Sequence, residues 1–133
     1  MRLLSSILIS ALLTGAVHAQ SLECIGEQRQ IADMWFGRKI GDRIAVTEQK
    51  WSRFVDREIT PRFPDGLSVV DARGQWRDSK RNRIVREPSK LVTIVLTGNG
   101  GDGQRLQAII DAYKSQFREQ SVGLVVRPAC VKF

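Results

Sequence analysis

Two amphipathic helical stripes, separated by strand-like segments, constrain the fold of this 133-residue chain more than any other feature. The first stripe consists of Trp51, Phe54, Val55 and Ile59. The second stripe consists of Leu106, Ile109, Ile110, Tyr113 and Phe117. Spacings of three, four and seven or eight residues place apolar side chains on one face of a helix. We therefore expect two helices, the first capped by Thr47 and ended by Thr60-Pro61, because a residue before proline disfavours helical geometry.

The segments around these helices predict strands. Strands are expected at residues 34–40, 67–77, 83–87 and 91–96, the last two interrupted by Pro88-Ser89, and at 122–126. The resulting order is β-α-β-β-α-β, which is typical of ferredoxin-like α+β domains. We expect a four-stranded antiparallel sheet in the order 4-1-3-2 with two helices on one face. Because residues 91–96 are apolar on both faces, the other face of the sheet is expected to be covered, for example by a second subunit.

The first nineteen residues resemble a secretory signal peptide. Arg2 precedes an apolar run over residues 3–16, and Val17-His18-Ala19 is a small-x-Ala exit. Cleavage between Ala19 and Gln20 would remove the only histidine and leave a single α+β domain at 20–133, with its core at about 34–127. The mature chain would then lack an imidazole for general base catalysis or metal binding. It would also lack a transmembrane segment, and we expect a periplasmic or secreted protein.

Cys24 and Cys130 are the only cysteines, and both remain in the mature domain. In an oxidising compartment an even pair favours a disulfide, and the expected strand order brings the start of the first strand to the end of the last. Free thiols and an acylated lipoprotein cysteine are the alternatives. A lipobox requires a small residue before the cysteine, and Glu23 occupies that position.

The chain is strongly basic, with 21 Lys and Arg against 14 Asp and Glu. Loss of Arg2 with the leader reduces the net charge from +7 to +6. This surface favours an anionic partner, although many exported domains are simply basic. Nucleic acid is not expected, because the sequence offers few aromatics on central strands for stacking bases. Residues 98–103 match G-x-G-x-x-G outside a parallel βαβ unit, so we interpret them as a loop and expect no cofactor and no metal.

Seven residues are candidates for a polar ligand site with an aromatic wall: Arg62, Asp65, Gln75, Trp76, Arg77, Arg86 and Glu87. Arginine binds carboxylate or phosphate through two parallel hydrogen bonds. Glu87 or Asp65 would serve as an acid or base if desolvated. The structural alternative is a network of Arg62–Asp65 and Arg86–Glu87 ion pairs, with Trp76 covering the edge of the core.

Several of these motifs carry a resemblance to a family. They are Trp51, the turn over residues 60–67, Gly74-Gln75-Trp76-Arg77 and Arg86-Glu87. On these residues the chain, from Trp35 to Val126, resembles the DUF3574 family of small exported bacterial proteins of uncharacterised function. The resemblance implies no activity and no catalytic residues. Family members often carry a lipobox cysteine, which this chain lacks.

Two functions follow from these observations. The first is a non-enzymatic binding or interaction module of the bacterial envelope, with a small anion or an envelope protein as partner. The second is a small dimeric α/β-barrel enzyme that acts on a small anionic substrate at the open sheet face. A carboxylate held with a raised pKa in a pocket on that face would favour the enzyme. A flat apolar face would favour the interaction module.

The predicted signal peptide implies a mature protein of specific mass. Protein purified from the envelope fraction should have an intact mass that lacks residues 1–19. A lipid-modified mass at Cys24, or a retained N-terminus, would contradict this prediction.

Overall fold

The computed structural model describes residues 23–119 and 122–133. The predicted signal peptide at residues 1–19 lies outside the described residues. The described elements are β1 (Glu27–Gly37), β2 (Lys39–Ile40), β3 (Arg43–Ile44), α1 (Glu48–Phe54), the π-helix η1 (Val55–Ile59), β4 (Leu67–Asp78), β5 (Arg83–Leu96), α2 (Asp102–Phe117) and β6 (Gly123–Val131).

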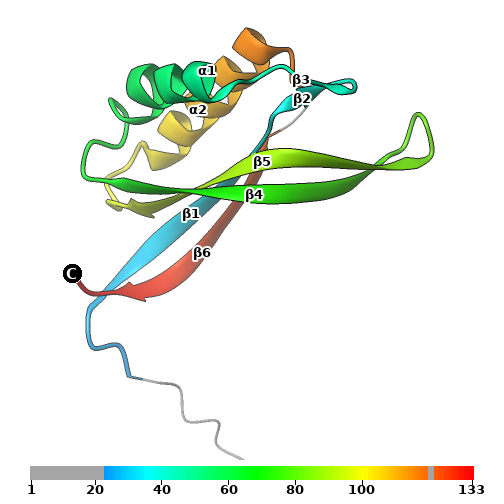
Figure 1. The fold of residues 1–133 in the computed structure, drawn as a ribbon. Coiled ribbons are helices and arrows are strands. Elements are labelled where there is room, and N and C mark those ends of the chain that lie inside the picture. The colour runs from blue at the N-terminus through cyan, green and yellow to red at the C-terminus, as the bar shows by residue number, and fades with distance from the viewer. Residues whose placement is uncertain (1–22, 120–121) are drawn as a thin grey trace, which may run out of the picture.

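The four long strands form one antiparallel sheet in the order β4-β5-β1-β6. Since β1, β4, β5 and β6 are the first to fourth expected strands, the predicted order is confirmed. β1 pairs with β5 on one side and β6 on the other, so that Trp35 lies between Leu91 and Gly123. Both helices lie on the same side of this sheet (Figure 1). The result is an α+β domain with a four-stranded antiparallel sheet and two helices.

The core fills the space between the sheet and the helices. Its centre is an aromatic cluster in which Tyr113 lies 4.8 Å from Phe36 and 5.0 Å from Phe54, measured between ring centroids. Buried aliphatic side chains from β1 and β5 complete it: Ala32, Met34, Val92, Ile94 and Leu96. Trp51, Ile59, Leu106 and Ile109 are buried as well. Both predicted helical stripes therefore supply the core.

The first helix differs from the expected single α-helix. Thr47 caps it as predicted, and its hydroxyl accepts a hydrogen bond from the Lys50 amide at 3.3 Å. After Phe54 the helix widens into a π-helix, in which the Thr60 amide donates to the Val55 carbonyl at 2.9 Å. Phe54 and Ile59 are both buried, while Val55 is only half-buried. The wider turn accommodates this five-residue spacing on the buried face.

The first strand is longer than predicted, and it also ends earlier. It begins at Glu27 rather than Met34, because its first residues pair with β6. These residues are polar and largely exposed, so their composition did not indicate a strand. It ends at Gly37, and a separate ribbon of β2 and β3 follows. The two short strands turn at Gly41, whose φ of +62° favours glycine.

The predicted interruption at Pro88-Ser89 is wrong, because β5 is continuous through both residues. Pro88 lies opposite Arg73 of β4, and its carbonyl accepts a hydrogen bond from the Arg38 amide at 3.2 Å. The nitrogen and oxygen of a strand residue point to the same side, and on that side β1 has already ended at Gly37. The missing N–H of proline therefore costs no ladder hydrogen bond.

A disulfide joins Cys24 to Cys130, with a Cα–Cα distance of 5.5 Å. Cys130 lies opposite Gln28 in the ladder between β1 and β6, so the segment before β1 meets the end of the last strand. The bond links positions 106 residues apart. It thus ties the two ends of the described domain together.

Replacing both cysteines, in Cys24→Ser/Cys130→Ser, should lower the free energy of unfolding by about 2–5 kcal/mol, since a long cross-linked loop restricts the unfolded chain. Urea unfolding of the variant, the oxidised wild type and the reduced wild type measures this difference in unfolding free energy. The reduced wild type should match the variant. Equal midpoints for all three samples would show that the bond contributes nothing to stability.

Candidate functional site

The seven predicted site residues do not form one cluster. Arg62 follows η1, and its guanidinium donates to the Glu58 carboxylate at 2.9 Å and to the Glu58 carbonyl at 2.7 Å. The expected Arg62–Asp65 pair is therefore replaced by an Arg62–Glu58 pair one helical turn apart. Asp65 lies before β4 and lines a groove at the opposite end of that strand from Gln75.

The other five predicted residues lie together on the β4–β5 hairpin: Gln75, Trp76, Arg77, Arg86 and Glu87. We call residues 73–88 of this hairpin the arm. It extends past the rest of the sheet (Figure 1). Side chains alternate along a strand, so the arm has two different faces. Trp76 and Glu87 lie on one face, and Gln75, Arg77 and Arg86 lie on the other.

Glu87 is held by neighbours other than Arg86. Its carboxylate accepts a hydrogen bond from the Trp76 indole at 2.9 Å and another from the Lys39 amide at 3.1 Å. The carboxylate also lies over Gly37, where a Cβ would come within 2.8 Å of Oε1. The expected Arg86–Glu87 pair is wrong, because adjacent strand residues point to opposite faces. Trp76 is half-exposed and covers this carboxylate rather than the edge of the core.

The second face of the arm carries three arginines around one glutamine. Gln75 lies directly opposite Arg86, and Arg73 and Arg77 flank Gln75 on the same face of β4. A hollow of about 410 Å³ beside the hairpin is lined by residues of both faces: Arg73, Gln75, Arg86 and Pro88 from this face, and Gly74 and Glu87 from the other. The sequence-based set did not include Arg73, although the alternation of residues 73, 75 and 77 could have identified it.

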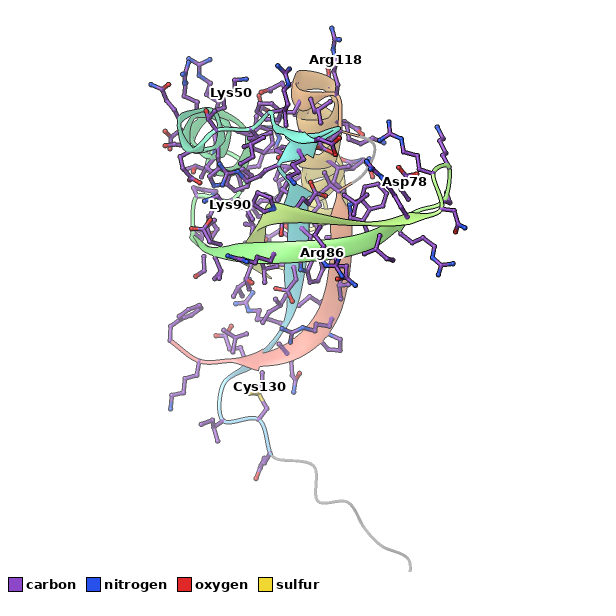
Figure 2. The ribbon with its side chains drawn as sticks, turned by 45° about the vertical axis from the view of Figure 1, so that its right-hand side comes forward. Lys50, Asp78, Arg86, Lys90, Arg118 and Cys130 are labelled. Atoms are coloured by element: carbon purple, nitrogen blue, oxygen red, sulfur yellow. A yellow bond between two sulfur atoms is a disulfide. The ribbon has the colours of Figure 1, made fainter. Side chains whose placement is uncertain are left out.

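A network of four charged residues lies between α1 and the sheet. Lys90 is 5% exposed, and its Nζ donates to Glu48 at 2.8 Å and to Asp71 at 2.5 Å (Figure 2 labels Lys90). Arg38 is also buried, and it reaches Glu48 at 2.5 Å and the Val46 carbonyl at 2.8 Å. The network joins the first turn of α1 to β4, β5 and the end of β1.

The network shifts the pKa values of Glu48, Asp71 and Lys90. The hydrogen bond from Lys90 is the main cause that lowers the pKa of both Glu48 and Asp71. Burial opposes the charge on Lys90, but its hydrogen bonds and attraction to Asp71 and Glu48 outweigh burial and raise its pKa. Glu48, Asp71 and Lys90 are thus held in their charged forms, which suits a structural role.

A groove of about 860 Å³ lies where the side of the sheet away from the helices meets residues 25–27 and 131–133. Its floor includes Thr93 and Val95 of β5, and one wall includes Asp65. The other wall includes Ile25 and Phe133, which lie next to the disulfide. The volume is within the range of small-molecule sites.

The sheet face away from the helices is largely apolar. Trp35, Val70 and Val125 are 39%, 56% and 47% exposed on three different strands. Between them lie half-buried apolar side chains of β1 and β5: Ile31, Leu91 and Val95. We call these six residues the open sheet face.

One polar group at the centre of this face is already satisfied. The Asp33 carboxylate accepts a hydrogen bond from the Thr93 hydroxyl at 2.7 Å, and the Arg127 guanidinium lies 3.3 Å from its other oxygen. Across residues 23–119 and 122–133, no group of three His, Cys, Asp or Glu side chains is placed to hold a metal ion. Within the same ranges, no helix has the length and apolar character needed to cross a membrane.

Comparison with known proteins identifies the family. The family model described as "Protein of unknown function (DUF3574)" matches residues 31–133. The chain belongs to the DUF3574 family. No curated protein sequence matches it.

Solved structures share the fold of this DUF3574 protein. One is a phage SAM lyase in complex with S-methyl-5'-thioadenosine, with a TM-score of 0.65 and 19% identity over 77% of this chain and 83% of that one. The same kind of lyase in its apo state has a TM-score of 0.61 and 19% identity over 84% and 89% of the two chains. CutA from Synechococcus elongatus has a TM-score of 0.50 and 13% identity over 77% and 78%. At these identities the likeness concerns the fold alone.

The charged network predicts a pH dependence of stability. Because the folded-state pKa values of Glu48 and Asp71 are lowered, their contribution is present above the unfolded values and is lost as pH falls through the folded ones. Wild-type protein should therefore lose unfolding free energy below about pH 4. In Lys90→Met, which removes the shared cation, this acid-dependent loss should be smaller.

Urea unfolding between neutral and acidic pH measures the effect. Lys50→Met is the matched control, because Lys50 is an exposed lysine of α1 outside the network. The control should retain the wild-type acid dependence. The same acid dependence in Lys90→Met and in the control would contradict the assigned role of Lys90.

Proposed function

We propose that this DUF3574 domain is an exported, non-catalytic interaction module that associates with a second copy of itself through the open sheet face. The observation that carries the proposal is the apolar surface formed by Trp35, Val70 and Val125 on the side of the sheet opposite the two described helices (Figure 1). Exposed apolar patches of this kind mark interaction sites in soluble domains. Burial of such a patch against a partner removes apolar area from water.

The neighbouring edge strand supports the same conclusion. β6 pairs with β1 on one side only, and Leu124, Val125 and Val126 are all more than one-third exposed. Three consecutive strand residues point to both faces, so this edge is uncovered on both sides. An exposed apolar edge strand is prone to pair with another chain unless it is covered.

The charge distribution favours a second copy as the partner. The whole chain carries a net charge of +7, so two copies repel each other over most of their surfaces. On the open sheet face, Asp33 and Arg127 balance each other beside the apolar side chains of Trp35, Val70 and Val125. Copies of a basic protein therefore meet at lowest electrostatic cost through this face. A two-fold arrangement lets the same patch serve both partners.

The alternative, an enzyme at this face, would need a carboxylate available for proton transfer. Asp33 is held by Thr93 and Arg127, and Glu87 is held by Trp76 and the Lys39 amide. Both carboxylates thus stabilise the sheet surface. This arrangement supports the interaction module over the enzyme.

Two further features of the proposal concern fold and location. The strand order and the placement of both helices support a ferredoxin-like βαββαβ assignment, with the β2–β3 ribbon as an addition. The disulfide between Cys24 and Cys130 supports an oxidising compartment, such as the periplasm or the exterior.

Sedimentation velocity over a concentration series tests the association. Wild-type mature protein should shift from the monomer to the dimer mass as concentration rises. Val125→Asp, which places a charge within the proposed interface, should remain monomeric. Ile44→Asp is the matched control, because Ile44 is a similarly exposed aliphatic residue on the separate β2–β3 ribbon.

The control should dimerise like the wild type. Circular dichroism should show that both variants are folded. A wild type that stays monomeric throughout, or a Val125→Asp protein that dimerises like Ile44→Asp, would contradict the proposal.

A further inference from the structure

Three exposed arginines of the arm, Arg73, Arg77 and Arg86, share one face of the hairpin. Several other guanidinium groups reach carboxylates, as in Arg29–Glu27, Arg38–Glu48, Arg105–Asp102 and Arg127–Asp33, whereas isolated surface arginines such as Arg43 and Arg57 form no ion pair within the described residues. Even at the tip of the hairpin, Arg83 lies 3.4 Å from Asp42 and Arg81 lies 3.9 Å from Asp78. Among the described residues, Arg73, Arg77 and Arg86 have no such acidic partner. We infer that these three arginines bind a phosphate or sulfate group carried by a ligand.

The strand register brings the three arginines to one place. Arg86 lies directly opposite Gln75, and Arg73 and Arg77 are its diagonal neighbours across the ladder. In an antiparallel pair, opposite Cβ atoms are about 4.5–5.5 Å apart and diagonal neighbours are about 7–8 Å apart. Long arginine side chains span such distances easily. All three guanidinium groups can therefore reach one oxyanion above Gln75.

The local charge is uncompensated. Like charges placed across a ladder are destabilising, and Arg86 has two cationic diagonal neighbours. Lys39 adds a fourth cation nearby, because its Nζ donates to the Arg86 carbonyl at 3.2 Å. The adjacent carboxylate of Glu87 is already held by Trp76 and the Lys39 amide. An anion from solution would supply the missing negative charge.

The donor set indicates the class of anion. Guanidinium groups form paired hydrogen bonds with phosphate and carboxylate oxygens, and the Gln75 amide adds a neutral donor. Three cationic forks from two strands offer more donors than the two oxygens of one carboxylate can accept. A tetrahedral group with three or four oxygens and up to two charges matches them better. Two of the arginines, Arg73 and Arg86, also line a hollow of about 410 Å³, which leaves space for part of the molecule that carries this group.

The site is independent of the proposed self-association. Arg73, Gln75 and Arg77 lie on the side of β4 away from the open sheet face. Side chains alternate along a strand, and Arg73 is three positions from Val70 of the open sheet face. A loss of anion binding therefore leaves the dimer test unaffected. Conversely, a monomeric protein could still bind the anion.

Isothermal titration with inorganic phosphate, in a buffer of low ionic strength, tests the site. Arg86→Gln should weaken phosphate binding by about tenfold or more, since it removes a charge-assisted pair of hydrogen bonds. Arg57→Gln is the matched control, because Arg57 is an exposed arginine of η1 and its loss changes the net charge equally. The control should bind within about twofold of the wild type, as expected for a distant surface charge. Titration with acetate should give much weaker binding than phosphate.

Several results would overturn the inference. One is a wild type that does not respond to phosphate, and another is equal weakening in Arg86→Gln and Arg57→Gln. Equal binding of acetate and phosphate would also exclude a site specific for a tetrahedral group. Circular dichroism and the melting temperature of each variant show that weaker binding does not come from unfolding.

A second arm of the experiment distinguishes the source of the phosphate. Co-sedimentation with phosphatidylcholine vesicles containing phosphatidic acid, compared with phosphatidylcholine alone, tests a lipid headgroup. Phosphate binding with Arg86-dependent recruitment to the acidic vesicles assigns a membrane source. Phosphate binding without recruitment assigns a soluble source. Both outcomes support the site. An equal loss of vesicle recruitment in Arg86→Gln and Arg57→Gln would instead contradict a membrane lipid as the source of the phosphate.

Discussion

β1 pairs with β5 on one side and with β6 on the other, and these two ladders position the rest of the domain. They carry buried side chains under both helices, and they bring Cys130 to the segment that contains Cys24. They also place Asp33 beside Thr93 and Arg127, which come from the two neighbouring strands. Interactions between distant parts of the chain therefore depend on the register of this central strand.

Both described helices lie on one side of the four-stranded sheet, so that its second face is not covered by a helix within residues 23–119 and 122–133. Here that face is largely apolar, and Asp33, Thr93 and Arg127 within it are joined to one another. The β4–β5 hairpin adds a different surface, because its outer part extends beyond the helices (Figure 1). The helices and the core stabilise the domain, while the uncovered sheet and the arm are available for binding.

The cationic side chains also divide into a structural set and a set available for binding. Where cations are buried, as at Lys90 and Arg38, carboxylates of α1 and β4 neutralise them and the network fastens the helix to the sheet. A buried charge without these partners would be costly. On the arm the arginines are exposed, so water can solvate them in the absence of an acidic partner. Burial thus separates the structural cations from the cations proposed to bind a ligand.

The sequence by itself determined the two helical faces, the strand order, the disulfide and the family, since these depend on local periodicity and on how chain ends meet in a known topology. It also placed Gln75, Trp76, Arg77, Arg86 and Glu87 near one another, as neighbours on one hairpin. Only the tertiary structure decided which of them share a face, because that depends on strand alternation and cross-strand register. The same holds for the burial of Lys90, since the packing of α1 over the sheet supplies Glu48 as its partner. The Arg62–Glu58 pair is instead a local contact one helical turn apart, which depends on how the chain continues after η1. Pro88 is tolerated within β5 for a tertiary reason as well, because β1 has ended on the side to which its nitrogen points.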